Sequence, residues 1–102
     1  PYSHYQAYGP TNAGASGLIY LWSHPDDPYP MGSAIPHPDH IAGKHAVIAV
    51  LAALDYKRRT GKGQFIDMAQ TEVAAALIGE IYLDYTINNR IAQPIGNRSL
   101  QG

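Results

Sequence analysis

The stretch PDHIAGKHAVIAVLAALDYKRRTG (38–61) decides the fold of this 102-residue chain. Its middle, AVIAVLAAL (46–54), is apolar on every side, which is typical of a helix buried inside a large protein. Asp39 can cap the start of such a helix, the three cations before Gly61 suit the negative end of its dipole, and Gly61 suits its end. A buried strand is the rival interpretation, because the segment holds β-branched residues. Four alanines, a cap and a basic last turn favour a helix over residues 40–60.

Shorter elements flank this helix. Residues 24–40 hold five of the eight prolines, which predicts a shaped extended loop, because proline cannot continue a helix or a central strand. Before the loop we predict a helix over residues 12–22, with Thr11 as its N-cap. After the long helix we predict a short strand or extended piece at 65–68. A second helix should follow to about Tyr85, since its apolar side chains recur every three and four residues.

Composition excludes several classes of function. Seven Lys and Arg against eight Asp and Glu give a net charge of −1, which argues against binding nucleic acid. The absence of cysteine excludes disulfides, thiolate zinc sites and a cysteine nucleophile. The longest apolar run is half the length needed to cross a bilayer, and no signal peptide is visible. We therefore expect a cytoplasmic protein without a membrane partner, and the ends at Pro1 and Gly102 suggest a fragment.

Asp39 is the polar residue best placed for chemistry. It follows Pro-His-Pro and precedes the long helix, where exposed N–H groups and the helix dipole favour an anion. A carboxylate held there stays ionised, which suits a nucleophile that attacks a carbonyl carbon. The alternative is that Asp39 only caps the helix, and spacing alone favours the cap.

Other polar and aromatic residues carry weaker signals. His37 and His40 could form a metal pair, and His45 could join them, but no third ligand stands at a recognised spacing, so we expect no metal site. The Gly-Lys-Gly turn after the long helix lacks the pattern of a phosphate loop. Three tyrosines near the start could stack on a ligand or only anchor a loop: Tyr2, Tyr5 and Tyr8.

Three segments in order together resemble the family III CoA-transferases, the group of formyl-CoA:oxalate and crotonobetainyl-CoA:carnitine CoA-transferases. The segments are Gly-Pro with Ala-Ser-Gly-Leu at 9–18, Asp39-x-x-x-Gly43 opening an alanine-rich helix, and Arg-Thr-Gly-Lys-Gly-Gln-x-x-Asp at 59–67 followed by Glu72. Gly-Asn-Arg-Ser at 96–99 resembles a further element of many members. The resemblance spans essentially all 102 residues.

The resemblance implies an α/β fold. Family members are several-fold longer, with a Rossmann-like large domain, a small domain and two interlocked subunits. Residues 1–102 would be a helix-rich slice of the large domain, truncated at both ends, from an interlocked homodimer. Such a slice alone would be inactive.

The resemblance also implies the chemistry. Asp39 falls on the family's catalytic aspartate, which carries CoA from an acyl-CoA donor to a carboxylic acid acceptor through aspartyl anhydride and aspartyl-CoA thioester intermediates. CoA thioester is then the substrate, and no cofactor is permanently bound. Tyr8 lies close to a family active-site tyrosine and would bind substrate or CoA. The acidic residue that follows this tyrosine in some members is Gly9 here, which leaves substrate choice open.

Two other functions compete with CoA transfer. An α-methylacyl-CoA racemase shares the fold, but it needs an acid/base pair. Racemases carry a His-Asp pair near the region equivalent to residues 12–18, where this chain has no titratable side chain. The second alternative is a noncatalytic helical fragment that docks on a partner through its apolar faces.

Overall fold

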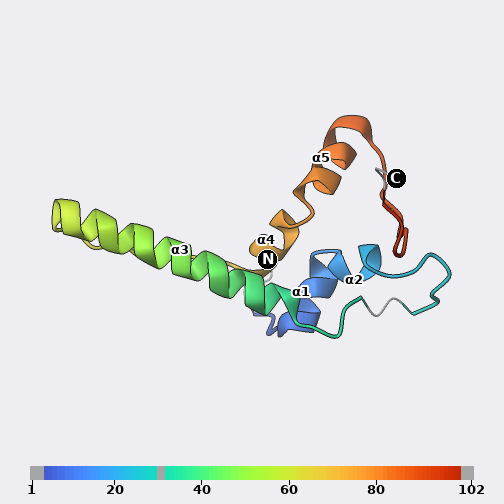
Figure 1. Ribbon diagram of the computed structural model, residues 1–102, viewed down its shortest axis with the longest axis horizontal. Helices are drawn as coiled ribbons and strands as arrows, with labels where there is room; N and C mark the ends of the chain where they lie inside the picture. The colour runs from blue at the N-terminus through green and yellow to red at the C-terminus, as the bar shows by residue number, and fades with distance from the viewer. Residues whose placement is uncertain (1–3, 30–31, 100–102) are drawn as a thin grey trace.

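Five helices and their connections make up the computed structural model, which describes residues 4–29 and 32–99 (Figure 1). α1 (Gly9–Ala15), α2 (Leu18–Leu21) and α4 (Gln70–Ala76) gather near the start of α3 (His37–Thr60). The far half of α3 and most of α5 (Gly79–Asn88) project away from this group.

The long helix predicted from the apolar stretch is confirmed as α3. It ends where expected, because Gly61 takes a φ of +74° in the left-handed region and its N–H donates to the carbonyl of Lys57 at 2.8 Å. Its start differs from the prediction. Pro36 occupies the N-cap position, and the helix begins at His37 because Pro38 fits a first turn that needs no N–H. The interpretation of Asp39 as the N-cap is therefore wrong, since Asp39 lies within the first turn.

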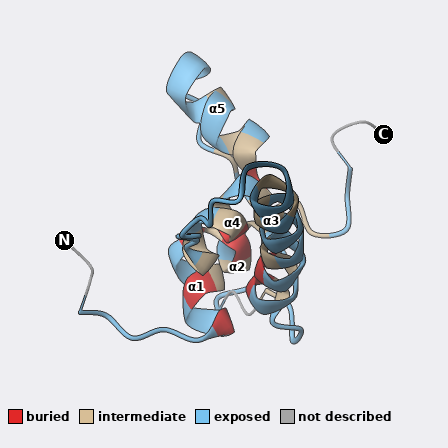
Figure 2. Ribbon diagram, turned by 90° about the vertical axis from the view of Figure 1, so that its left-hand side faces the viewer, coloured by how far each residue is buried: buried red, intermediate tan, exposed pale blue. Residues whose placement is uncertain are grey.

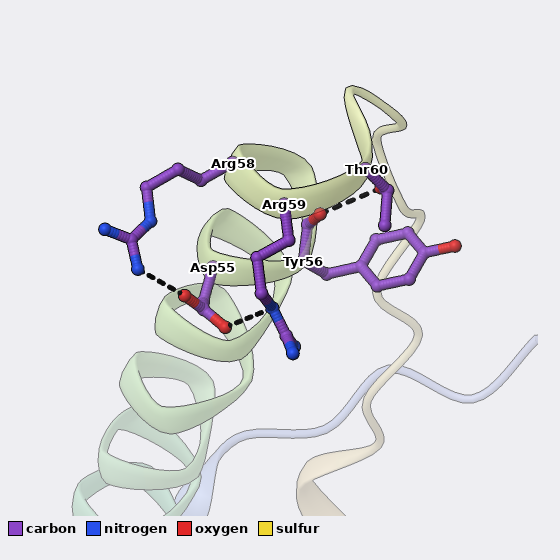
Figure 3. Close-up of polar contacts among 5 residues, drawn as sticks. All are labelled: Asp55, Tyr56, Arg58, Arg59 and Thr60. Carbon is purple, nitrogen blue, oxygen red and sulfur yellow. Dashed lines mark hydrogen bonds and ion pairs between the residues drawn. The ribbon is translucent and has the colours of Figure 1, made fainter.

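The basic last turn of α3 is held by one carboxylate (Figure 3). Asp55 accepts from Arg58 at 3.0 Å and pairs with Arg59 at 2.8 Å, while the Thr60 hydroxyl donates to the carbonyl of Tyr56 at 2.8 Å. Both arginines are largely exposed, so these ion pairs contribute at most about 1 kcal/mol each. The tip of α3 is thus a solvated helix end with partly neutralised charge.

The helix predicted over residues 12–22 is broken in two. Gly17 has a φ of +81°, which ends α1 and starts α2 on a new axis. Thr11 does not cap it, because Tyr8 stands at the N-cap of α1.

The helix predicted to reach Tyr85 is also broken. α4 ends at Ala76 and α5 begins at Gly79, after Ile78 leaves the helical conformation (φ −118°, ψ 30°). Ile78 is buried in the core at this point, so tertiary packing overrides the continuous helical pattern.

The expectation of an α/β fold with a Rossmann-like sheet is wrong for this chain. Within residues 4–29 and 32–99 there is no strand. Residues 65–68, predicted as a short strand or an extended piece, have no regular secondary structure, and no neighbouring strand pairs with their N–H and C=O groups. The described chain is therefore all-helical.

The core is small and the molecule is elongated. Its centre consists of Leu18, Ala74 and Ile78. Buried segments of the ribbon lie where α1, α2, α4 and the start of α3 meet (Figure 2). The radius of gyration is 16.8 Å, against about 13 Å for a compact chain of this length. Four large side chains in the middle of α3 are more than half exposed: Val47, Ile48, Leu51 and Leu54. The apolar stretch of α3 thus lies outside the core that the chain builds for itself.

A buried amide fixes α1 against α4. Asn12 is 7% exposed, accepts a hydrogen bond from the Thr71 hydroxyl at 2.8 Å, and donates to the side chain of Gln70. The Tyr82 hydroxyl adds a bond from α5 to the carbonyl of Ser16 at 2.9 Å. These contacts set the position of α1, and with it the residues that lie beside Asp39.

None of the helices in the described ranges has the length and hydropathy that a membrane span requires.

Candidate active site

Asp39 stands in the first turn of α3 with its side chain exposed. Its backbone N–H donates to the carbonyl of Pro36 at 3.1 Å. In residues 4–29 and 32–99 no hydrogen bond or ion pair occupies its carboxylate. The helix dipole favours negative charge at this position, and the oxygens remain available to an incoming group.

Gly9 lies directly against the Asp39 carboxylate. A Cβ placed on Gly9 would be 1.8 Å from Oδ2 and 2.9 Å from Cγ of Asp39, and 2.9 Å from Cβ of Pro36. The start of α1 and the start of α3 therefore abut at residue 9, which is buried. Residues 9 and 39 are thirty positions apart in sequence, so the fold alone brings them together.

Tyr8 precedes this contact. It caps α1 in an extended conformation, and its carbonyl accepts from the N–H of Asn12 at 2.9 Å. Its side chain is 84% exposed and makes no hydrogen bond to Asp39 in the described ranges. Tyr8 is thus bonded to Gly9, the residue that contacts Asp39, while the ring of Tyr8 lies in solvent.

A small cavity lies next to Gly9 and the start of α3. Its volume is about 50 Å³, and Gly9, Trp22 and His37 are among its lining residues, with several prolines. The rings of Trp22 and His37 meet edge to face with centroids 4.8 Å apart, and Nε2 of His37 lies 3.1 Å from the Ser33 hydroxyl. His37 is therefore engaged with the loop before α3.

The histidines considered as metal ligands do not converge. Nδ1 of His45 lies 3.0 Å from the carbonyl of Ile41, whereas His37 faces Ser33. Within the described ranges, no three His, Asp or Glu side chains come together to hold an ion. Of the three tyrosines considered for stacking, Tyr5 is exposed and Tyr2 lies outside the described residues.

This arrangement suits an exposed nucleophile. The carboxylate sits on a rigid helix start, one of its oxygens touches the Cα of a glycine, and its other side is open. A carboxylate nucleophile needs no general base to attack a carbonyl carbon. The exposed carboxylate could thus act as the nucleophile of an acyl transfer.

Comparison with known proteins defines the class. The chain matches CoA-transferase family III over residues 1–102. It is 33% identical to a succinate–glutarate CoA-transferase of Agrobacterium fabrum over 97 residues, which is 95% of this chain and 24% of that protein. The chain belongs to CoA-transferase family III.

Other relatives agree with this assignment. The chain is 30% identical to a mouse succinyl-CoA:glutarate CoA-transferase, across 94% of this chain and 22% of that protein. Among solved structures it superposes on a CAIB/BAIF family protein from Brucella suis with a TM-score of 0.87 at 30% identity, covering 95% of this chain and 25% of that one. The chain thus spans about a quarter of the length of the relatives it matches.

The sequence singled out Asp39 as a candidate but did not predict what surrounds it. Gly9 was notable only because an acidic residue stands there in some members, and its contact with Asp39 was not predicted. The hydrogen bonds by which Asn12 fixes α1 against α4 were also not predicted. An asparagine amid small apolar residues was the one available signal, because a buried amide needs partners.

Proposed function

We propose that the longer protein containing this chain transfers CoA from an acyl-CoA donor to a carboxylic acid, with Asp39 as the nucleophile. The observation that carries the proposal is the exposed carboxylate of Asp39, free of hydrogen bonds and ion pairs in the described ranges, at a rigid helix start. Membership of CoA-transferase family III supports the reaction class.

In the first half-reaction Asp39 attacks the thioester carbonyl of the donor. The C–S bond breaks, CoA leaves as a thiolate, and an acyl–aspartyl anhydride remains. The thiolate then attacks the aspartyl carbonyl of this anhydride and releases the donor acid as a carboxylate. The product is an aspartyl-CoA thioester.

The second half-reaction runs the same steps in reverse with the acceptor. The acceptor carboxylate attacks the aspartyl-CoA carbonyl and expels the thiolate, giving a second anhydride. The thiolate attacks the acceptor's carbonyl, which yields the new acyl-CoA and restores Asp39. Each tetrahedral oxyanion needs N–H donors, and water must be excluded because it would hydrolyse both intermediates.

The remaining parts of the proposal concern the whole protein. Because the chain spans about a quarter of its relatives, we place it within a longer, interlocked homodimer in which other segments complete the CoA site. Tyr8 would contribute to substrate binding from the turn before α1. The names of several relatives include succinyl-CoA, so it is the first donor to test, with glutarate, L-malate and oxalate as acceptors.

Asp39→Asn in the longer protein tests the proposal. An amide cannot form an anhydride, so turnover should fall by several orders of magnitude. The fold should survive, since the change removes only the carboxylate's interaction with the helix dipole, worth about 0.3–1 kcal/mol.

The matched control is Asp55→Asn, on the same helix and also partly exposed. It should leave turnover unchanged. Near-normal turnover in Asp39→Asn, with no deamidation back to Asp by mass spectrometry, would show that another group is the nucleophile.

A further inference from the structure

At residue 9 no Cβ fits while Asp39 keeps the rotamer seen here. A Cβ there would meet Asp39 at 1.8 Å and the Cβ of Pro36 at 2.9 Å, both far inside ordinary contact distance. Gly14, in the same helix, differs: its Cβ would meet only Cδ1 of Ile19, at 3.7 Å. The crowding at residue 9 therefore comes from Pro36 and Asp39 at the start of α3.

A positive φ does not explain this demand for glycine. The glycines with positive φ in the described ranges are four others: Gly17, Gly32, Gly61 and Gly96. Gly9 is the first residue of α1 and precedes Pro10, which adds a backbone preference for a residue without a Cβ in the helical conformation. The crowding beside Asp39 and Pro36 is the larger constraint, since a Cβ would lie 1.8 Å from Oδ2 of Asp39.

The two neighbours of Gly9 differ in how easily they move. Pro36 presents a ring carbon at the N-cap of α3, fixed by the helix that follows. Oδ2 of Asp39 is the end of a side chain that can rotate to another rotamer. A methyl group at residue 9 would therefore displace the carboxylate more readily than the helix.

We propose that Gly9 is a positioning residue for the nucleophile, an inference that rests on the proposed function of Asp39. The Cα of Gly9 supports one face of the carboxylate and holds it in the rotamer seen here, so the thioester must approach from the opposite, exposed side. Filling this space would make the carboxylate retreat by roughly 1.5 Å to reach ordinary contact. A misplacement of about 1 Å at a reacting group lowers the rate on the order of 100-fold.

Kinetics of Gly9→Ala in the longer protein test the proposal, with succinyl-CoA as donor and glutarate, L-malate and oxalate as acceptors in turn. We expect kcat to fall on the order of 100-fold while KM for succinyl-CoA changes less than about threefold, because the methyl group adds bulk beside the carboxylate and removes no side chain that binds substrate. Gly14→Ala should keep the wild-type kcat, since a methyl group fits at that position.

A double-mutant cycle on the melting temperature needs no substrate. It compares the decrease in melting temperature that Gly9→Ala causes in the wild type and in the Asp39→Ala background. If the methyl group strikes the carboxylate, the loss should be smaller once the carboxylate is gone. A Gly9→Ala protein that folds only in the Asp39→Ala background would support the contact most strongly.

Different outcomes test the positioning role of Gly9 and the nucleophile role of Asp39. A kcat for Gly9→Ala within threefold of wild type, or an equal thermal loss or failure to fold in both backgrounds, would overturn the positioning role. Undiminished turnover in Asp39→Asn would overturn the proposed nucleophile instead, whatever Gly9→Ala does. Loss of kcat in Gly14→Ala equal to that in Gly9→Ala would also refute the positioning role, since it would mean that α1 tolerates no change.

Discussion

The 102-residue chain by itself should fail to form a cooperative fold, because its longest helix leaves its apolar middle uncovered. Val47, Ile48, Leu51 and Leu54 are 57–65% exposed. Fully burying such a side chain stabilises a fold by about 1.5–3 kcal/mol, so about 1–2 kcal/mol of this stabilisation is lost for each side chain that stays more than half in water. For the four side chains together the loss is about 4–8 kcal/mol, which is comparable with the net stability of a small domain, about 5–15 kcal/mol.

Circular dichroism, calorimetry and dye binding on the purified chain measure this directly. We expect a helical far-UV spectrum, a gradual thermal change without a heat-capacity peak, binding of a hydrophobic dye and association at micromolar concentration. The double variant Ile48→Gln with Leu51→Gln should reduce dye binding and association while keeping the helical signal. A soluble monomer with one sharp transition, whose calorimetric and van't Hoff enthalpies agree, would refute the reasoning.

Two stability predictions concern the longer protein and are read from its apparent melting temperature. Asn12→Ala should destabilise it by about 1–3 kcal/mol, because it leaves Thr71 and Gln70 without their buried partner. An unchanged melting temperature would show that the hydrogen bonds of Asn12 do not stabilise the protein. Gly61→Ala should cost about 1 kcal/mol through its φ of +74°, although nothing crowds the position. Gly63→Ala, with open space and no positive φ, is its control, and an equal effect of both would contradict the conformational argument.

Local signals in the sequence predicted the long helix because its stop is chemically unambiguous. The basic last turn and Gly61 end α3 at the predicted residue. Its start was placed too late, because the prolines before and after His37 are compatible both with a loop and with a first helical turn. Asp39 was therefore assigned as a cap when it lies inside the helix.

The helix breaks and the missing sheet depend on partners distant in the sequence. Ile78 interrupts a regular apolar pattern because it packs into the same core as Leu18 on α2. Residues 65–68 have the composition of a strand, but a strand exists only beside another strand, and none is described here. Neither outcome follows from a local pattern.

The role of Asp39 stays a prediction, and the geometry around it did not follow from the sequence. The Pro-His-Pro-Asp pattern before an apolar helix drew attention to Asp39 but favoured a cap, and the family resemblance made it the candidate nucleophile. The contact with Gly9 was not predictable, because it requires α1 to be fixed against α3 and α4 by Asn12 and the core. A glycine also has no side chain to signal its purpose.

Trapping the enzyme-bound acyl group on Asp39 tests the central claim most directly. The longer protein is incubated with succinyl-CoA and hydroxylamine, digested, and its peptides sequenced by mass spectrometry. The anhydride and thioester intermediates both place an activated carbonyl on the Asp39 side chain, so hydroxylamine should convert that residue to a hydroxamate and inactivate the enzyme. Samples without succinyl-CoA, and the Asp39→Asn variant, should carry no hydroxamate. A hydroxamate on another carboxylate, or none on Asp39 while CoA transfer proceeds, would contradict the account.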